Sequence, residues 1–242
     1  MTSDFTSQSG YEVRFEWGES GLRALMGQVK TIVIFDVLSF TTCVSVACAR
    51  GAHVLPFPWR DERASAFAAE RDALLARPRS DTQGYTLSPA SLAELPAGGR
   101  LVLPSPNGSH LSYLAAQSGA VFAGSLRNAS ALAERLCVAP RPIAVIAAGE
   151  RWPDHRLRPC VEDLVGAGAL IARLYGSVSP EAELARAAWE SAAPSLERVL
   201  RTCASGIELA ERGFAEDVEL AAQLDADRVA PLLRDGAFGS ES

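Results

Sequence analysis

The chain has 242 residues, of which 48% are hydrophobic and 21% charged, and it carries a formal net charge of −6. A chain of this length and composition can bury a substantial core and has too little charge for wholesale disorder. Its acidic balance argues against a nucleic-acid partner, which would need clustered Lys and Arg. Because neither a signal-peptide pattern nor an apolar run of spanning length occurs, we expect a cytoplasmic protein with no membrane partner.

The first part of the chain alternates apolar strands with helical segments. Residues 11–17 alternate polar and apolar side chains, which predicts an edge strand with one solvated face. Residues 31–35 are a continuous β-branched and aromatic run, which predicts a strand covered on both faces that ends at Asp36. The remaining strands and helices expected in this part are strands at 53–57, 101–103, 120–123 and 143–147 and helices at about 42–50 and 61–77.

Strands that alternate with helices predict a three-layer α/β/α fold with a largely parallel, mixed sheet. The sequence then becomes helical from residue 161 to about 224, which predicts a helical C-terminal region. Nothing in the composition marks a second domain, so we expect one domain over 1–242, with loose tails at 1–10 and 236–242. Residues 78–99 are rich in Ser, Pro and Gly, which predicts either a functional loop or a partly disordered one.

Ligands in open α/β sheets bind beyond the carboxyl ends of the strands, so residues that directly follow a strand are the first candidates for a site. Asp36 follows a buried strand, and the hydroxyls of Thr41 and Thr42 lie near the start of the next helix. A carboxylate beside free helix amides suits metal-assisted phosphoryl chemistry. The alternative is that Asp36 caps the helix and the two threonines simply pack.

Polar residues follow two further strands and begin one further helix. The segment Asn107-Gly108-Ser109 and the pair Ser125 and Asn128 each lie between a strand and a helix. Turn and cap chemistry would explain these residues equally well. Glu162 and Asp163 begin an apolar helix, where a solvated carboxylate pair is the ordinary alternative to a metal site.

Signatures of other enzyme classes are missing from the sequence. The five cysteines are widely spaced without a Cys-x-x-Cys pair, which predicts reduced thiols, and the three histidines lack the spacing of zinc ligands. No Gly-x-Ser-x-Gly segment supports acyl hydrolysis, and the glycines at 166 and 168 do not complete a dinucleotide fingerprint.

Taken in order, these segments resemble the 2-phosphosulfolactate phosphatase family. The family's segment that begins with Asp-Val, continues with an arginine and ends with Thr-Thr is similar to residues 36–42, and its Asn-Gly-Thr turn is similar to residues 107–109. Its Gly-Ser-x-x-Asn-Ala and Glu-Asp-x-x-x-Ala-Gly segments match residues 124–129 and 162–168. No single motif is specific, but the ordered set is, and it extends from about residue 31 to residue 235.

The resemblance implies a Mg²⁺-dependent hydrolase of the coenzyme M pathway that removes phosphate from a small anionic ester, 2-phosphosulfolactate. It implies that Asp36, Glu162 and Asp163 act in catalysis and hold Mg²⁺. Our hypothesis is that water attacks the ester, and direct attack by Asp36 stays open. A homodimer is expected from base rates. The residues expected to bind the substrate are Thr41, Thr42, Asn107, Gly108, Ser109, Ser125, Arg127 and Asn128.

The chain departs from the family at positions that would bind an anion. Ser39 stands where the family usually has an arginine, a side chain well suited to gripping phosphate or sulfonate. Leu87 and Pro106 also replace polar family residues. The loss of the family arginine permits another substrate or a family member that only binds anions. The α/β pattern alone leaves a nucleotide-binding enzyme as a further alternative. The arginines considered as replacements are Arg127, Arg151 and Arg156.

Overall fold

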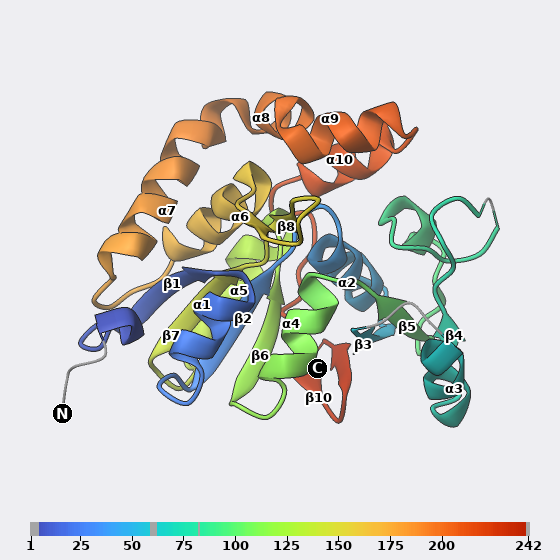
Figure 1. The fold of residues 1–242 in the computed structure, drawn as a ribbon, viewed down its shortest axis with the longest axis horizontal. Helices are drawn as coiled ribbons and strands as arrows, with labels where there is room; N and C mark the ends of the chain where they lie inside the picture. Colours follow the sequence, from blue (N-terminus) through green and yellow to red (C-terminus); the bar gives the residue numbers. More distant parts are fainter. Residues whose placement is uncertain (1–4, 59–61, 82, 241–242) are drawn as a thin grey trace.

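The computed structural model describes residues 5–58, 62–81 and 83–240. Its strands are β1 (Val13–Trp17), β2 (Thr31–Phe35), β3 (His53–Phe57), β4 (Leu74–Leu75), β5 (Arg100–Pro104), β6 (Ala120–Gly124), β7 (Ile143–Ala147), β8 (Glu150–Arg151), β9 (Leu157–Arg158), β10 (Leu232–Arg234) and β11 (Ala237–Gly239). Within the described ranges, one sheet has the order β1-β7-β2-β6-β10-β11-β3-β5-β4, and β8 and β9 form a separate hairpin (Figure 1). The predicted mixed, largely parallel sheet is confirmed.

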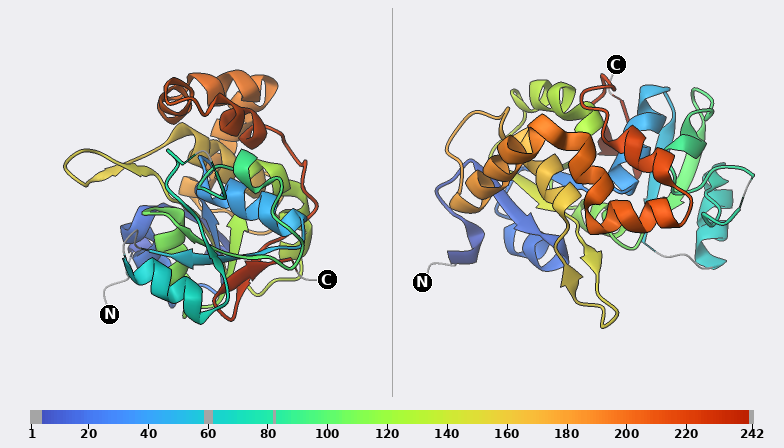
Figure 2. Two further views of the ribbon diagram at one scale, coloured as in Figure 1. Left: turned by 90° about the vertical axis from the view of Figure 1, so that its right-hand side faces the viewer. Right: turned by 90° about the horizontal axis from the view of Figure 1, so that it is seen from above.

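Helices cover both faces of the sheet (Figures 1 and 2). The helices are α1 (Gly18–Leu25), α2 (Phe40–Ala49), α3 (Glu62–Glu70), α4 (Gly108–Ala115), α5 (Ala129–Leu136), α6 (Val161–Ile171), α7 (Pro180–Ala192), α8 (Leu196–Thr202), α9 (Ala204–Glu211) and α10 (Ala215–Ala221). One face of the sheet packs against α1, α2 and α4, and the other packs against α6 and α7, with α5 beside α6. The three-layer prediction is therefore confirmed. In the described ranges no helix is long and apolar enough to cross a membrane.

Strand β2 shows why a continuous apolar run marks a central strand. It pairs in parallel with β7 on one side and β6 on the other. Val33 and Phe35 enter the core on the α6 face, while Ile32 and Ile34 enter the core on the α2 face. Because alternate side chains of a strand point to opposite faces, a strand buried on both sides needs an apolar residue at every position. The run therefore ends where Asp36 reaches the edge of the sheet.

Residues 237–239 are part of the sheet, which differs from the predicted loose tail at 236–242; residues 241–242 lie outside the described ranges. Strands β10 and β11 form a hairpin that joins β6 to β3. Asp235 and Gly236 form its two-residue turn, with φ values of 50° and 79°. Two consecutive positive φ angles are the requirement of the tight turns that match strand twist, and Asp-Gly is a favoured pair for them. The sequence signal was present, but the flanking strands are too short to show a period.

The N-terminal segment also packs against the sheet in its described part, which corrects the predicted loose tail at 1–10; residues 1–4 lie outside the described ranges. Strand β1 is an edge strand, as predicted. The side-chain amide of Gln8 donates to the carbonyl of Phe15 at 2.8 Å and accepts from the amide of Phe15 at 3.2 Å. This pairing satisfies one exposed position of the edge in the manner of a neighbouring strand.

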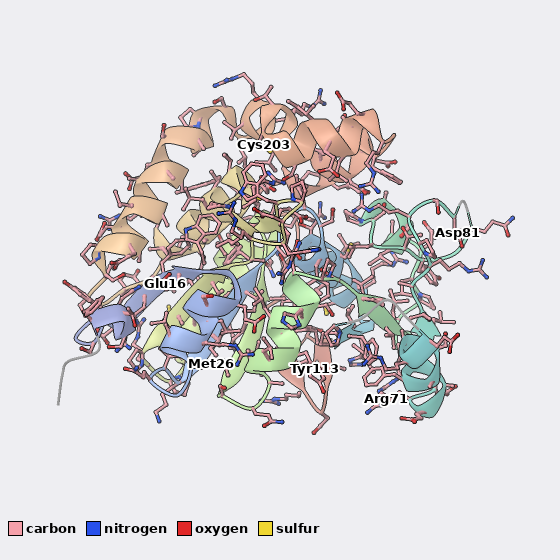
Figure 3. The ribbon with its side chains drawn as sticks, in the orientation of Figure 1. Glu16, Met26, Arg71, Asp81, Tyr113 and Cys203 are labelled. Carbon is pink, nitrogen blue, oxygen red and sulfur yellow. The ribbon has the colours of Figure 1, made fainter. Side chains whose placement is uncertain are left out.

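The C-terminal helices α7 to α10 form an arch along one side of the molecule (Figure 1). Within the region predicted to be helical, α8 and α9 are two separate helices that meet at Cys203, a residue labelled in Figure 3. Cys203 has extended backbone angles, and its sulfur accepts from the amide of Gly206 at 3.4 Å. The corner turns α9 toward the carboxyl ends of the strands, where the candidate site lies.

Sequence reasoning missed or misplaced several short elements. Helix α1 was not predicted, and the helix predicted over 61–77 ends at Glu70 and is followed by β4. The β8–β9 hairpin projects from the body of the molecule (Figure 2). The described part of the segment 78–99 is folded against the rest of the chain, and it contains the short turn η2 (Ala90–Leu92).

Candidate active site

A cavity of about 840 Å³ opens beyond the carboxyl ends of β2, β5 and β7. Asp36 follows β2, Ser105 and Asn107 follow β5, and Glu150 follows β7; all four line the cavity. Helix α9 lines its opposite side. Four arginines also line it although the whole chain is acidic, and these are Arg79, Arg151, Arg158 and Arg212. The cavity therefore combines carboxylates with a concentration of positive charge.

Asp36 is the most enclosed carboxylate on the cavity wall, with 6% of the residue exposed. Its Oδ2 accepts from the amide of Gly108 at 2.6 Å and from the hydroxyl of Ser105 at 3.2 Å. Burial, followed by the negative charge of Glu150, raises the pKa of Asp36 from 3.8 to about 6. A carboxylate that is buried, turned toward a cavity and beside a second carboxylate is an arrangement that functional sites use.

The contact between Gly108 and Asp36 requires glycine. A Cβ added at Gly108 would lie 2.7 Å from both Cβ and Oδ2 of Asp36, and 2.6 Å from Cδ1 of Phe40. These distances are shorter than real carbon contacts, so any side chain would push Asp36 or the start of α4 aside. The glycine of the Asn-Gly-Ser segment thus sets the position of the carboxylate.

We expect Gly108→Ala to lower kcat/KM by about 100-fold, the cost of a displacement near 1 Å at a reacting group. Stability should fall by about 1–3 kcal/mol, as in other overpacked sites. Gly27→Ala is the control, because Gly27 has a φ of +78° but open space around its added Cβ. That variant should lose about 1–2 kcal/mol to backbone strain and keep its activity. Equal activity losses in both variants would contradict the positioning role of Gly108.

Asp163 lies in the first turn of α6 and joins two strand ends. Its Oδ1 accepts from the amide of Val37 at 2.8 Å, and its Oδ2 accepts from the amide of Gly149 at 2.8 Å. Burial, then the charges of Glu162 and Asp36, raise the pKa of Asp163 well above its usual value. Asp163 thus holds the loop that carries Asp36 to the loop that carries Glu150, but it does not line the cavity.

The three carboxylates predicted to hold a metal are not grouped at one point in the described part of the chain. Glu162 is buried and turned toward the α8–α9 corner, where Cys203 Sγ lies 3.4 Å from its Oε2. Asp163 is occupied by backbone amides, as described above. Among residues 5–58, 62–81 and 83–240, no three His, Cys, Asp or Glu side chains meet in a way that could hold a metal ion. Three carboxylates line the cavity: Asp36 and Glu150 follow strand ends, and Glu208 lies on α9.

Three of the predicted substrate-binding hydroxyls are committed to the protein itself. Thr41 Oγ1 accepts from the amide of Asp36 at 3.0 Å, and Thr42 Oγ1 donates to the carbonyl of Val37 at 2.7 Å. Ser109 Oγ donates to the carbonyl of Phe57 at 3.0 Å. All three hydroxyl residues are fully buried. They shape the turn after β2 and the start of α4, as the packing alternative anticipated for the threonines.

The predicted residues after β6 also lie away from the cavity. Asn128 Oδ1 accepts from the amide and hydroxyl of Ser125 at 2.8 and 3.1 Å, so the pair closes its own turn. Arg127 forms a two-point ion pair with Asp227, with both hydrogen bonds at 2.8 Å. None of these side chains lines the cavity. The substrate-binding role expected for Ser125, Arg127 and Asn128 therefore does not fit their positions.

Two of the expected site residues after β5, Asn107 and Gly108, lie at the cavity or beside Asp36. The amide of Gly108 contacts Asp36, and Asn107 lines the cavity. The side chain of Asn107 makes no hydrogen bond within the described part of the chain, so its amide is available to a ligand in the cavity. Asn107 also lines an adjoining cavity of about 390 Å³, which shares Glu150 and Arg151 with the larger one.

The arginines of the cavity were mostly missed by sequence reasoning. Arg151 lines it as anticipated, but Arg156 is 83% exposed, pairs with Asp154 and lines only the smaller adjoining cavity. Arg79 belongs to the segment 78–99, whose composition had predicted a functional or disordered loop. No spacing rule connects this loop to β2, so only the folded chain reveals its contribution.

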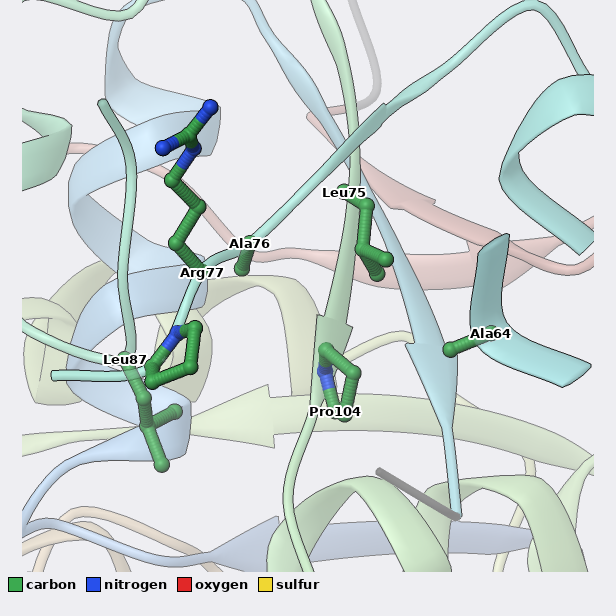
Figure 4. A pocket seen from close by; sticks show the side chains of 7 residues that line it. Ala64, Leu75, Ala76, Arg77, Leu87 and Pro104 are labelled. Carbon is green, nitrogen blue, oxygen red and sulfur yellow. The ribbon is translucent and has the colours of Figure 1, made fainter. Parts of the chain in front are cut away.

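A third, apolar cavity of about 200 Å³ lies beside this loop (Figure 4). Its wall is formed by α3, β4, the end of β5 and the loop itself, and it shares Pro78 and Leu87 with the large cavity. Figure 4 shows mostly aliphatic side chains around it, including Ala64, Leu75 and Pro104. Among the described residues its wall has no carboxylate, so it is not the candidate site.

Comparison with known proteins agrees with the ordered motifs. Residues 23–236 match the model of the 2-phosphosulpholactate phosphatase family. A protein of Carboxydothermus hydrogenoformans named a probable 2-phosphosulfolactate phosphatase is 30% identical over 223 residues, which cover 88% of this chain and 91% of that protein. A protein of Deinococcus radiodurans with the same name is 31% identical over 219 residues, covering 84% and 88%. The chain, with its strand-end carboxylate facing an arginine-lined cavity, belongs to the 2-phosphosulfolactate phosphatase family.

Proposed function

We propose that the protein hydrolyses the phosphate monoester of 2-phosphosulfolactate, releasing sulfolactate and inorganic phosphate. The observation that carries the proposal is the buried Asp36 at the wall of a cavity that four arginines line. The phosphate, sulfonate and carboxylate of this substrate make it strongly anionic. Guanidinium groups suit all three of its anionic groups, because their planar N–H donors match the oxygens of such groups. The names of the relatives support the same substrate.

We further propose that Mg²⁺ assists the reaction and that Asp36 and Glu150 hold it. Mg²⁺ is commonly held by one or two carboxylates together with waters and substrate phosphate, so two carboxylates on one cavity suit it. Asp36 and Glu150 line the same cavity, and the negative charge of Glu150 contributes to the raised pKa of Asp36, which favours a cation between them. A bound Mg²⁺ would offset negative charge on the phosphoryl group and lower the pKa of a water molecule.

The protein groups then have separate tasks. The amide of Gly108 and the hydroxyl of Ser105 fix one oxygen of Asp36, so the carboxylate keeps its direction. The free amide of Asn107 is placed to bind a phosphoryl oxygen in the same cavity. Glu150 is our candidate base for an attacking water. Direct attack by Asp36 is distinguished by rapid quench with ³²P-labelled substrate, which would leave label on the protein.

The decisive test is phosphate release from 2-phosphosulfolactate by the purified protein with and without Mg²⁺. We expect turnover with Mg²⁺ and its loss on chelation. If the protein released no phosphate from this ester or from related phosphohydroxy acids, yet bound sulfolactate, it would be an anion-binding member of the family. In that event Asp36→Asn should leave sulfolactate binding unchanged, because no metal-assisted step would depend on the carboxylate.

The pH dependence of activity should show the ionisation of the Asp36 carboxyl. Because its pKa is raised to about 6, the ionised form that binds a cation is lost as the pH falls through that value. At low Mg²⁺ the rising limb of kcat/KM should therefore have a midpoint near pH 6. At Mg²⁺ concentrations above the dissociation constant of the Mg²⁺ complex, each tenfold increase in concentration should lower the midpoint by about one pH unit, because the metal and the proton compete for Asp36. A midpoint independent of Mg²⁺ would contradict the proposed ligand.

A further inference from the structure

We infer that Arg79 binds the anionic group of the substrate that is not transferred, a sulfonate or carboxylate, and so selects esters that carry such a group. The inference rests on the proposed function and deepens it by assigning the second end of the ligand to a particular side chain. Arg79 comes from the loop after β4 and lines the cavity together with Asp36 and Ser39.

The guanidinium of Arg79 is held in one orientation before any ligand arrives. Its Nη1 donates to Asp217 Oδ2 at 2.9 Å, and its Nη2 donates to Ser39 Oγ at 2.8 Å and to the carbonyl of Leu87. Its Cζ lies 4.8 Å from the centre of the Phe214 ring, and the side chain is 10% exposed. A fixed, partly desolvated guanidinium loses little side-chain entropy when it binds an anion.

The hydrogen bonds of Arg79 leave part of its donor capacity unused. A guanidinium has five N–H donors, and within the described residues Arg79 uses three of them. Arg127 gives a contrast, because it grips both oxygens of Asp227 and also bonds to Leu220 and Gln223. Arg127 does not line the cavity, whereas Arg79 does. The hydrogen bonds of Arg127 are those of a structural ion pair, whereas those of Arg79 leave donors for a ligand.

Arg79 and Asp36 reach the cavity from different segments of the chain, and we assign the phosphate to the end at Asp36. Arg79 belongs to the loop after β4 and pairs with Asp217 of α10, whereas Asp36 follows β2 and is held by the amide of Gly108. Ser39 lies between the two ends, bonded to Arg79 and three residues after Asp36. A longer side chain at position 39 would occupy the space that Arg79 fills. The small residue at 39 and the arginine from the loop therefore work as a pair.

The test compares two phosphate esters in Arg79→Gln and Arg79→Lys. 2-Phosphosulfolactate carries anions beside the phosphate, whereas glycerol 2-phosphate carries none. We expect kcat/KM for 2-phosphosulfolactate to fall about 10- to 100-fold, the loss typical of hydrogen bonds between charged groups. The value for glycerol 2-phosphate should stay within about threefold. Added guanidinium ion should restore part of the loss in a smaller variant, Arg79→Ala.

Arg173→Gln is the matched control. Arg173 has the same kinds of partner, namely Asp225, Ser130, the carbonyl of Ala169 and the ring of Trp189, but it lies away from the cavity. Arg173→Gln should lose as much stability as Arg79→Gln. The ratio of its kcat/KM values for the two esters should equal that of the wild type. Equal losses for both esters in Arg79→Gln, or no loss for either, would overturn the inference.

Calorimetric titration with sulfolactate separates this inference from the proposed function. The titration needs no turnover, so it applies even if the wild-type protein hydrolyses neither ester. Weaker sulfolactate binding in Arg79→Gln, with wild-type binding in Arg173→Gln, would support the role of Arg79 in an inactive protein. Unchanged binding in Arg79→Gln would overturn it. If Arg79→Gln does not fold, Arg79→Lys serves in its place, because Lys keeps the charge but loses the planar donors.

Discussion

Replacing Asp36 with asparagine is expected to abolish phosphate release, lowering kcat by at least about 1,000-fold, while the protein becomes more resistant to denaturation at pH 8. The loss of activity follows from removing the charge that the proposed reaction needs. The gain of stability follows from the surroundings of the carboxylate, which is buried and next to Glu150, with no arginine or lysine among the main influences on its pKa.

The sign of the stability change follows from the raised pKa. Asp36 has a pKa of about 6 in the folded protein against 3.8 in the unfolded chain, so its ionised form destabilises the fold above pH 6. Above pH 6 this ionisation lowers the free energy of unfolding by about 3 kcal/mol, and the cost disappears as the pH falls from 6 toward 3.8. Asparagine removes the charge but keeps only one acceptor for the amides of Gly108 and Phe40, so we expect a net gain of about 1 kcal/mol.

Chemical denaturation at pH 8 and pH 5 measures this effect, and Asp227→Asn is the control. Asp227 is equally buried, but its charge is paired with Arg127. Its replacement should cost about 3–5 kcal/mol, because a buried guanidinium loses its partner, and should leave kcat unchanged. If Asp36→Asn were destabilised at pH 8 to the same degree, the carboxylate would be a structural group and not a strained functional one.

Replacing Asp163 should reveal a positioning role and not the catalytic role expected from the sequence. Asp163→Ala leaves the buried amides of Val37 and Gly149 without acceptors, at about 1–3 kcal/mol each. The loops that carry Asp36 and Glu150 would then separate, and kcat/KM should fall by about 100-fold. Asp163→Asn keeps one acceptor, so its activity should fall between those of the wild type and Asp163→Ala.

Glu162→Gln is the neighbouring control for this experiment. Glu162 is also buried, but it faces Cys203 and does not reach the strand ends. We expect activity within about threefold of wild type and an unchanged Mg²⁺ requirement. A higher Mg²⁺ requirement, or loss of Mg²⁺-stimulated activity, in either Glu162→Gln or Asp163→Asn at preserved stability would restore the three-carboxylate metal site that the sequence suggested.

The strands and the position of Asp36 were predictable because burial on both faces demands an apolar residue at every position of a strand. Residues 31–35 carry that signal in full, and Asp36 ends it. The ordered motifs between residues 31 and 235 were sufficient for the family, which the comparisons confirm. The short hairpin β10–β11 was missed because three-residue strands show no period, although its Asp-Gly turn was visible.

The arginine-lined cavity with Asp36 on its wall was therefore only partly foreseeable. Spacing along the chain indicates which residues share one face of a helix or strand, but not which elements meet. Glu162 and Asp163 are adjacent, yet one faces Cys203 and the other holds the strand ends. Arg79 and Ser39 are 40 positions apart, yet they form a hydrogen bond of 2.8 Å. The local patterns determined the strands, the family and the strand-end carboxylate, whereas only the packing of distant segments decided which charges face it.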